Sequence, residues 1–225
     1  MTPDALIRAR YGIRPEAPSP FAAPETVPPA LATILDRRVT RRYRAEPIPE
    51  PLLHTLLAAM QSAPSKSDLQ QYSVIVLQDA QKIAQIARWI GGMDWIAEAP
   101  VFLLFCGDIR RGRRVCALHG RSHANDNVDT FVNATADAAL AMGTMILAAE
   151  AAGLGTCPIS YVRNHVEKIG PMCSLPEGVF PVAGLTLGVP EGSRNWLSPR
   201  LPQHLVVHRE SYDDSGLEAA LPAYD

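Results

Sequence analysis

Apolar residues occur along the chain in two kinds of segment. In one kind they have helical spacing, and in the other they form short unbroken runs. Helical spacing predicts helices over residues 30–37, 49–62, 81–90 and 162–173. Apolar runs rich in β-branched and aromatic residues predict strands over 72–77, 100–107 and 182–189, with 156–161 extended and 205–208 as a candidate fourth strand. Because helices and strands interleave without a regular βαβ rhythm, we expect an α+β fold with helices around a small sheet.

The longest predicted element is a helix over residues 128–152. Its only charged residues are Asp129, Asp137 and Glu150, so it is apolar on nearly all faces. A helix of this kind has to be buried on nearly all sides. We therefore expect a central helix that is shared with a dimer partner.

The Pro- and Ala-rich stretch at 15–30 favours neither helix nor central strand. A chain of 225 residues is long enough for one domain with tails. We expect an N-terminal arm over 1–30, one domain over 31–212 and a C-terminal tail over 213–225.

Composition and charge exclude several classes of protein. The net charge of −2 argues against a nucleic-acid binder, and no uninterrupted apolar run reaches the roughly 18 residues of a membrane span. Charged residues interrupt the first 14 positions, so we do not expect export. The four cysteines form no Cys-x-x-Cys pair, which indicates reduced thiols in a cytoplasmic protein. His119, His123 and Asp126 lie in a stretch that reads as a loop, and we expect no metal site there.

Against this near-neutral background, five arginines fall within the eight residues 37–44. Such a local cluster is suited to one compact anion, because guanidinium groups bind phosphate or carboxylate in bidentate fashion. The cluster alone has a second interpretation, in which the arginines bind no ligand and form the solvent-exposed C-terminal end of a helix. Positive charge is favourable there because of the helix dipole. Two other segments carry polar groups on turns: Ser65-Lys66-Ser67, and Arg200 between Pro199 and Pro202. The first of these can present donors to a ligand or can be a plain turn.

In this order, these segments resemble the nitroreductase family of FMN-dependent oxidoreductases, over roughly residues 31–212. They are most similar to its NADPH nitroreductase and flavin reductase branch. The stretches that carry the resemblance are 36–43, 46–48, 63–70, 105–108, 148–155, 162–164, 175–176, 184–190 and 199–202.

The resemblance implies a nitroreductase-like fold, with a small, mainly antiparallel central sheet surrounded by helices, in an intertwined homodimer with FMN at the subunit interface. It implies that Arg37, Arg38, Val39, Arg41 and Arg200 hold the phosphate and ribityl region, the contact of Val39 being through its backbone. It places Ser65, Lys66 and Ser67 against the flavin of the partner subunit. It places Pro158, Ile159, Ser160 and Tyr161 beside the flavin ring, with a backbone N–H near Ser160 directed at N5.

The activity implied is ping-pong hydride transfer from NADPH or NADH to nitroaromatics, quinones or flavins, without a catalytic side chain. Two alternatives stay open: an FMN-binding protein for storage or sensing, and a specialised member with flavin-destroying or dehalogenating activity. A small-molecule electron acceptor is expected, with no nucleic-acid or membrane partner.

The sequence departs from the family pattern at several positions. In this chain Val39 replaces a Ser of the family, Asp68 an Asn, Met93 a flavin-contacting Gln, Ser198 a Lys, and Ser160-Tyr161 a Gly pair. The sequence also ends at Asp225, without the basic extension that contacts NADPH in that branch, which leaves NADH and NADPH both open as reductants.

Overall fold

The computed structural model describes residues 2–14, 17, 23–192 and 197–223. The chain divides into two compact units. We call residues 39–193 the sheet unit, and residues 1–38 with 194–225 the terminal unit.

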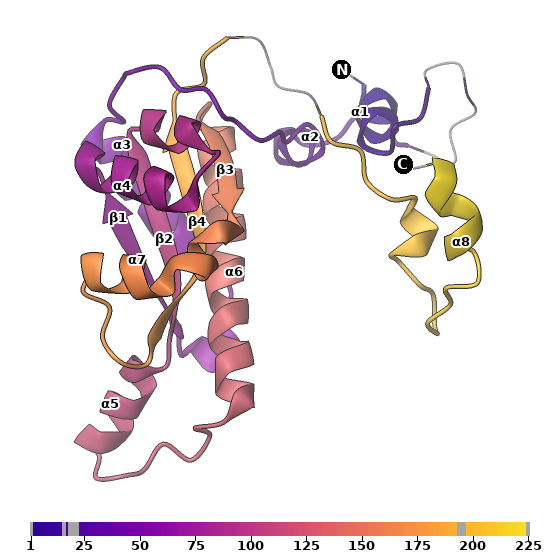
Figure 1. Ribbon diagram of the computed structural model, residues 1–225. Coiled ribbons are helices and arrows are strands. Elements are labelled where there is room, and N and C mark those ends of the chain that lie inside the picture. Colours follow the sequence, from indigo (N-terminus) through magenta and orange to yellow (C-terminus); the bar gives the residue numbers. More distant parts are fainter. Residues whose placement is uncertain (1, 15–16, 18–22, 193–196, 224–225) are drawn as a thin grey trace. The chain divides into compact units, whose positions relative to one another are not determined.

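The sheet unit is built around an antiparallel sheet that has four strands among the described residues (Figure 1). The strands are β1 (Tyr72–Leu77), β2 (Val101–Asp108), β3 (Gly155–Ile159) and β4 (Val179–Gly188). Their order is β1-β2-β4-β3, and all neighbouring strands are antiparallel. This confirms the expected α+β class with a small antiparallel sheet.

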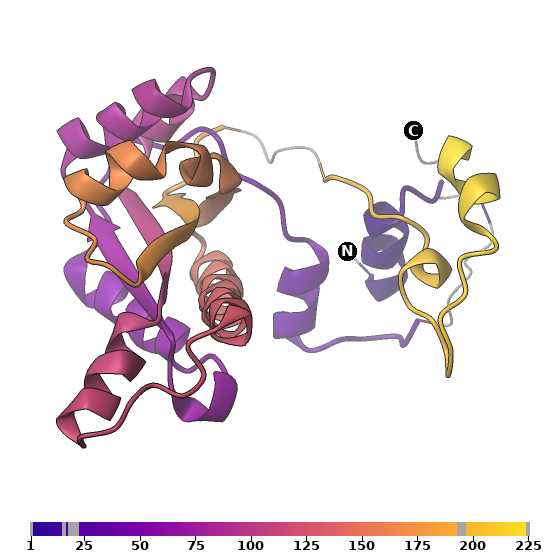
Figure 2. The same ribbon diagram turned by 60° about the horizontal axis from the view of Figure 1, so that its bottom comes forward.

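Helices cover both faces of this sheet (Figure 2). The helices of the unit are α3 (Glu50–Gln61), α4 (Ala80–Ile90), α5 (Arg110–Leu118), α6 (Val128–Ala151) and α7 (Val166–Met172). On one face α3 and α6 pack with Leu103, Phe105 and Leu185 of the sheet. On the other face α4 and α7 pack with Phe102 and Leu104. Alternate β2 residues thus enter two separate cores, as the period of two along a strand requires.

Most predicted elements are present close to their expected bounds, and three differences have local causes. The candidate strand at 205–208 is wrong, because the Val206 and Val207 N–H groups bond back to the Gln203 carbonyl and form a turn. The extended stretch at 156–161 ends at Ile159, where the short 3₁₀ helix Ser160–His165 begins. Helix α5 had not been predicted, because none of residues 110–118, which the structure describes in full, is buried.

Helix α6 is buried on one face only within this chain. Ala134, Ala138 and Met145 are fully buried, whereas Phe131 and Val132 are about half exposed, at 49% and 55%. Among the described residues, α6 is the one helix long and apolar enough to cross a membrane, a test that the core helix of a soluble protein also passes. Its buried face against the sheet identifies it as such a core helix, and its other face remains uncovered.

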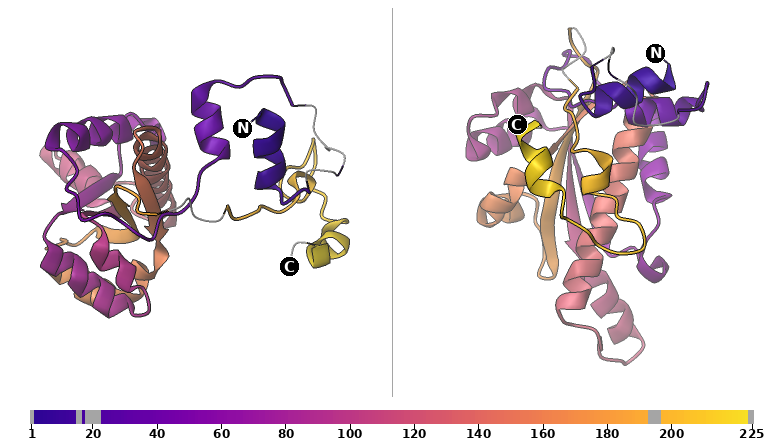
Figure 3. Two further views of the ribbon diagram at one scale, coloured as in Figure 1. Left: turned by 90° about the horizontal axis from the view of Figure 1, so that it is seen from above. Right: turned by 90° about the vertical axis from the view of Figure 1, so that its right-hand side faces the viewer.

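The terminal unit contains α1 (Pro3–Arg10), α2 (Pro29–Leu35) and α8 (Leu217–Ala220), with short 3₁₀ turns at Gln203–Leu205 and Leu221–Ala223. The side chain of Thr2 caps α1 by accepting the N–H of Ala5, and Asp4 pairs with Arg8 at 2.6 Å along the helix. Helix α1 packs beside α2 (Figure 3). Helix α2 corresponds to the predicted helix at 30–37, whereas α1 had not been predicted.

Candidate functional site

The arginine block of residues 37–44 crosses the division between the two units. Arg37 and Arg38 follow α2 in the terminal unit, which also contains Arg200, whereas Arg41 belongs to the sheet unit. The predicted phosphate ligands therefore fall into two sets.

In the terminal unit, a residue that sequence analysis missed lies among the predicted arginines. Arg10, at the end of α1, donates to the backbone oxygens of Leu35 and Arg37, both at 2.7 Å. The backbone N–H of Arg200 donates to the carbonyl of Arg10 at 2.8 Å. Burial and the nearby charges of Arg200, Arg37 and Arg38 lower the pKa of Arg10. The structure thus gathers Arg10, Arg37, Arg38 and Arg200 into one positively charged cluster, which fits a phosphate.

In the sheet unit, the segment that carries Arg41 is attached to β3. Val39 forms a bridge with Thr156, and the Thr40 N–H donates to the Thr156 carbonyl at 2.8 Å. Gly155 permits this approach, because a Cβ there would stand 2.4 Å from Oγ1 of Thr40. The backbone at Val39 is thereby fixed against the strand that leads to Pro158.

Tyr43 closes the other end of this segment. Its buried hydroxyl donates to the Thr40 carbonyl at 2.6 Å and lies 2.8 Å from Oγ1 of Thr186. Burial raises the pKa of Tyr43 far above its usual value, so the hydroxyl stays protonated and remains a donor. The guanidinium of Arg41 lies 5.7 Å from the ring centroid of Trp95, within cation–π range. Trp95 lies in the 3₁₀ helix Asp94–Glu98, and the half-buried Met93 directly precedes this helix.

The turn that carries Ser65, Lys66 and Ser67 has a strained backbone. Ser67, Asp68 and Gln70 all have positive φ, at 51°, 55° and 46°, a conformation that costs about 1 kcal/mol or more per residue. Lys66 and Ser67 are exposed, as residues that present groups to a ligand have to be. Strain in an exposed turn is typical of a functional segment whose shape is imposed by its surroundings.

Asp137 of α6 anchors this turn at both ends. Its side chain is 1% exposed, and its two carboxylate oxygens accept the backbone N–H groups of Lys66 and Gln71, each at 2.9 Å. Sequence analysis noted Asp137 only as one of three charges on an apolar helix. A lone carboxylate on a buried helix face was the available signal, since a buried charge requires partners.

The fourth set of predicted residues lies at the end of β3. Pro158 pairs with Leu185, and Ile159 is buried in the second core. Ser160 and Tyr161 are exposed at the start of the 3₁₀ helix, Tyr161 at 48%. Two exposed residues thus follow directly on two that pack within the sheet unit, and their place beside a flavin stays a prediction.

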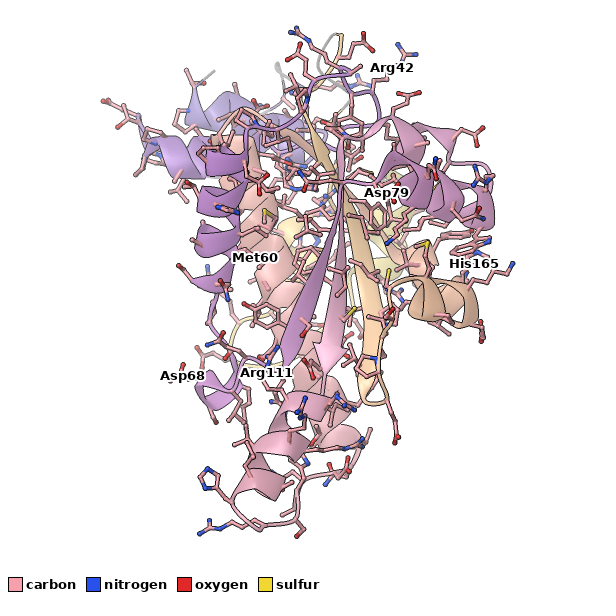
Figure 4. All side chains as sticks on the ribbon, turned by 90° about the vertical axis from the view of Figure 1, so that its left-hand side faces the viewer. Arg42, Met60, Asp68, Asp79, Arg111 and His165 are labelled. Atoms are coloured by element: carbon pink, nitrogen blue, oxygen red, sulfur yellow. The ribbon has the colours of Figure 1, made fainter. Side chains whose placement is uncertain are left out.

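The Ser65–Ser67 turn and the Arg41 segment lie at opposite ends of the sheet. The turn precedes Tyr72, which is paired with Gly107 near the end of β2, whereas Thr156 pairs with Leu187, opposite Val101 at the start of β2. Figure 4 shows Asp68 beside Arg111 at one end and Arg42 at the other. The length of β2 separates the two sites by roughly 20 Å. One chain alone therefore does not bring them together.

A sequence model described as the nitroreductase family matches residues 34–189. The chain belongs to the nitroreductase family. This confirms the resemblance drawn from the sequence. Helix α1 and Arg10 lie outside the matched residues.

Several nitroreductase relatives are similar over most of the chain. A protein of Bacillus subtilis named FMN reductase [NAD(P)H] is 38% identical over 87% of this chain and 79% of its own length. A protein of Pseudomonas sp. named CR(VI) reductase is 35% identical over 82% of this chain and 76% of its own length. The solved structure of the hypothetical oxidoreductase YcnD from Bacillus subtilis has a TM-score of 0.84 at 38% identity, covering 87% of this chain and 80% of its own. These relatives confirm the nitroreductase fold.

Proposed function

We propose that this protein is an FMN-dependent oxidoreductase that uses NADPH or NADH to reduce nitroaromatics, quinones or flavins. The observation that carries the proposal is the cluster of Arg37, Arg38 and Arg200 in a nitroreductase chain. The FMN phosphate has up to two negative charges, and several arginines are needed to offset them. The relatives named FMN reductase and NADPH-flavin oxidoreductase support the same cofactor and reductant.

The residues of the chain bind and orient the cofactor and leave the electron transfer to it. Arg37, Arg38, Arg41 and Arg200 would hold the phosphate and ribityl region, and the backbone of Val39, which is bridged to Thr156 of β3, would contribute to it. When bound, FMN supplies hydride chemistry at N5, which the nicotinamide donor and the acceptor use in turn. A backbone N–H near Ser160 would donate toward that atom.

The exposed residues around this position would shape the acceptor site. Ser65, Lys66 and Ser67 are exposed or half-buried on a turn whose shape Asp137 fixes, so they can line the flavin. Tyr161, which stands where the family has glycine, adds bulk beside the ring position and would narrow the space for the acceptor. A small-molecule acceptor fits this enzyme class.

A homodimer is part of the proposal. The exposed apolar face of α6, with Val128, Phe131, Val132 and Leu140, is a surface that a second copy would bury. A dimer would also let the Ser65–Ser67 turn of one subunit serve the flavin held by the other. Sedimentation of the purified protein should give about twice the 24.4 kDa mass of the chain. A monomer that binds FMN fully would contradict this arrangement.

The nitroreductases form a soluble family, and we place this member in the cytoplasm. Cys106 is a buried free thiol, and burial raises its pKa to about 12, which keeps it protonated and unreactive. Recovery of the protein in a membrane or exported fraction of its native cells would contradict this placement.

The central test combines the absorption spectrum with turnover. The purified protein should show the bands of bound flavin and should oxidise NADH or NADPH with a quinone, giving parallel double-reciprocal lines as ping-pong kinetics require. Bound FMN without oxidation of either donor would overturn the reductase in favour of a flavin-storage or sensing protein. Oxygen-dependent loss of the bound flavin after reduction would instead indicate a flavin-destroying member.

A further inference from the structure

Arg10 connects two segments of the terminal unit that are far apart in sequence. Its guanidinium makes four hydrogen bonds: Nε to the Leu35 carbonyl at 3.2 Å, Nη2 to the Leu35 and Arg37 carbonyls at 2.7 Å each, and Nη1 to the Ser198 carbonyl at 3.2 Å. Its own carbonyl accepts the Arg200 N–H at 2.8 Å. Arg37 and Ser198 follow Arg10 by 27 and 188 residues. One side chain therefore fixes the backbones that carry Arg37 and Arg200.

The charge of Arg10 adds to that of the residues it connects. Burial lowers its pKa, and Arg200, Arg37 and Arg38 lower it further by repulsion, whereas Asp36 acts in the opposite direction. Guanidinium groups remain protonated at neutral pH, so Arg10 keeps its charge, and the repulsion from Arg200, Arg37 and Arg38 adds to the larger effect of burial. Repulsion of this kind is relieved when an anion binds between the groups.

We propose that Arg10 is a positioning residue of the FMN phosphate site and that its charge contributes to phosphate binding, so that α1 is a working part of the cofactor site. The proposal rests on the proposed function, in which Arg37, Arg38 and Arg200 hold the phosphate. The four bonds engage four of the five N–H donors of the guanidinium. Arg10 therefore acts mainly by aligning the other arginines. It also brings a cation next to Ser198, where the resemblance expects a lysine.

Flavin affinities of full-length variants test this role directly. Apoprotein is titrated with FMN and, in parallel, with riboflavin, which lacks the phosphate, and the quenching of flavin fluorescence gives both dissociation constants. Arg10→Ala should weaken FMN binding about tenfold, and Arg10→Lys, which keeps the charge but loses the planar fork, should weaken it about threefold. Arg14→Gln is the matched control, because Arg14 is an exposed arginine of the same segment. Riboflavin affinity should be the same in all four proteins.

The outcomes separate this role from general damage and from failure of the proposed function. Equal FMN affinity in Arg10→Ala and Arg14→Gln would overturn the role of Arg10 while leaving the function intact. A parallel loss of FMN and riboflavin affinity would also overturn it, because that pattern shows damage unrelated to the phosphate. If Arg10→Ala does not fold, the FMN-to-riboflavin ratio of Arg10→Lys decides in the same way. Wild-type protein that binds no FMN would refute the proposed function itself.

Discussion

Replacing Arg38 with alanine should weaken FMN binding about 100-fold, whereas Arg44→Ala should leave it nearly unchanged. Arg38 is largely buried, and Asp36 orients its guanidinium at 3.0 Å. It also belongs to the cluster whose charges act on Arg10. Arg44, from the same sequence block, has a side chain that is 56% exposed and lies 3.6 Å from Glu46 on the surface. An exposed pair of this kind contributes little to binding or stability.

The comparison of Arg38→Ala with Arg44→Ala is matched, because both variants remove one arginine and one positive charge. The flavin that each purified variant retains after gel filtration, followed by titration of the apoproteins with FMN, measures the difference. Thermal unfolding without FMN shows whether either variant is damaged. Equal flavin retention in the two variants would contradict the phosphate role of Arg38.

The elements that could be predicted from the sequence are those with a buried face. The strand at Tyr72–Leu77 was predicted with the bounds observed. The predicted helix at 128–152 is one residue longer than α6 as observed. In each, apolar residues follow the period of the element because they pack against the sheet. Helices α1 and α5 carry few buried residues, and α5 is rich in arginine, so no apolar stripe marks them. Polar contacts such as the Thr2 cap of α1 and the ion pair of Arg113 in α5 with Asp126 leave little trace in the hydrophobic pattern.

The candidate site could be predicted where its side chains form a visible cluster in the sequence, and residues that hold those side chains in place were missed. The block at 37–44 is visible as a charge cluster, and the Ser65–Ser67 turn as a polar turn. Arg10 lies 27 residues before Arg37, beyond a Pro-rich stretch, and binds mainly backbone carbonyls, which carry no residue signature. Asp137 likewise binds backbone N–H groups. Contacts to the backbone depend on the fold alone, so a single sequence does not reveal them.

Replacing Asp137 with asparagine should destabilise the protein by about 3 kcal/mol and weaken flavin binding. The carboxylate accepts one N–H at each oxygen, from Lys66 and Gln71, in a buried position. Asparagine offers one acceptor oxygen and one NH₂ group, so a donor would face one of the two backbone N–H groups. Because Ser67, Asp68 and Gln70 have positive φ, the turn should relax once this anchor is lost.

Thermal unfolding and FMN titration of the full chain measure the two effects of Asp137→Asn. A loss of about 3 kcal/mol should lower the Tm by roughly 10 °C in a chain of this size. Asp129→Asn is the control, since Asp129 is an exposed carboxylate in the first turn of the same helix and should cost at most about 1 kcal/mol. If the two variants unfolded at the same temperature, the carboxylate of Asp137 would not be what holds the turn. If only flavin binding changed, the turn would contact the cofactor without contributing to the stability of the fold. We expect Asp137→Asn to lower both the thermal stability and the FMN affinity. The buried bonds between α6 and the turn stabilise the fold and also help set the shape that the turn presents to the flavin.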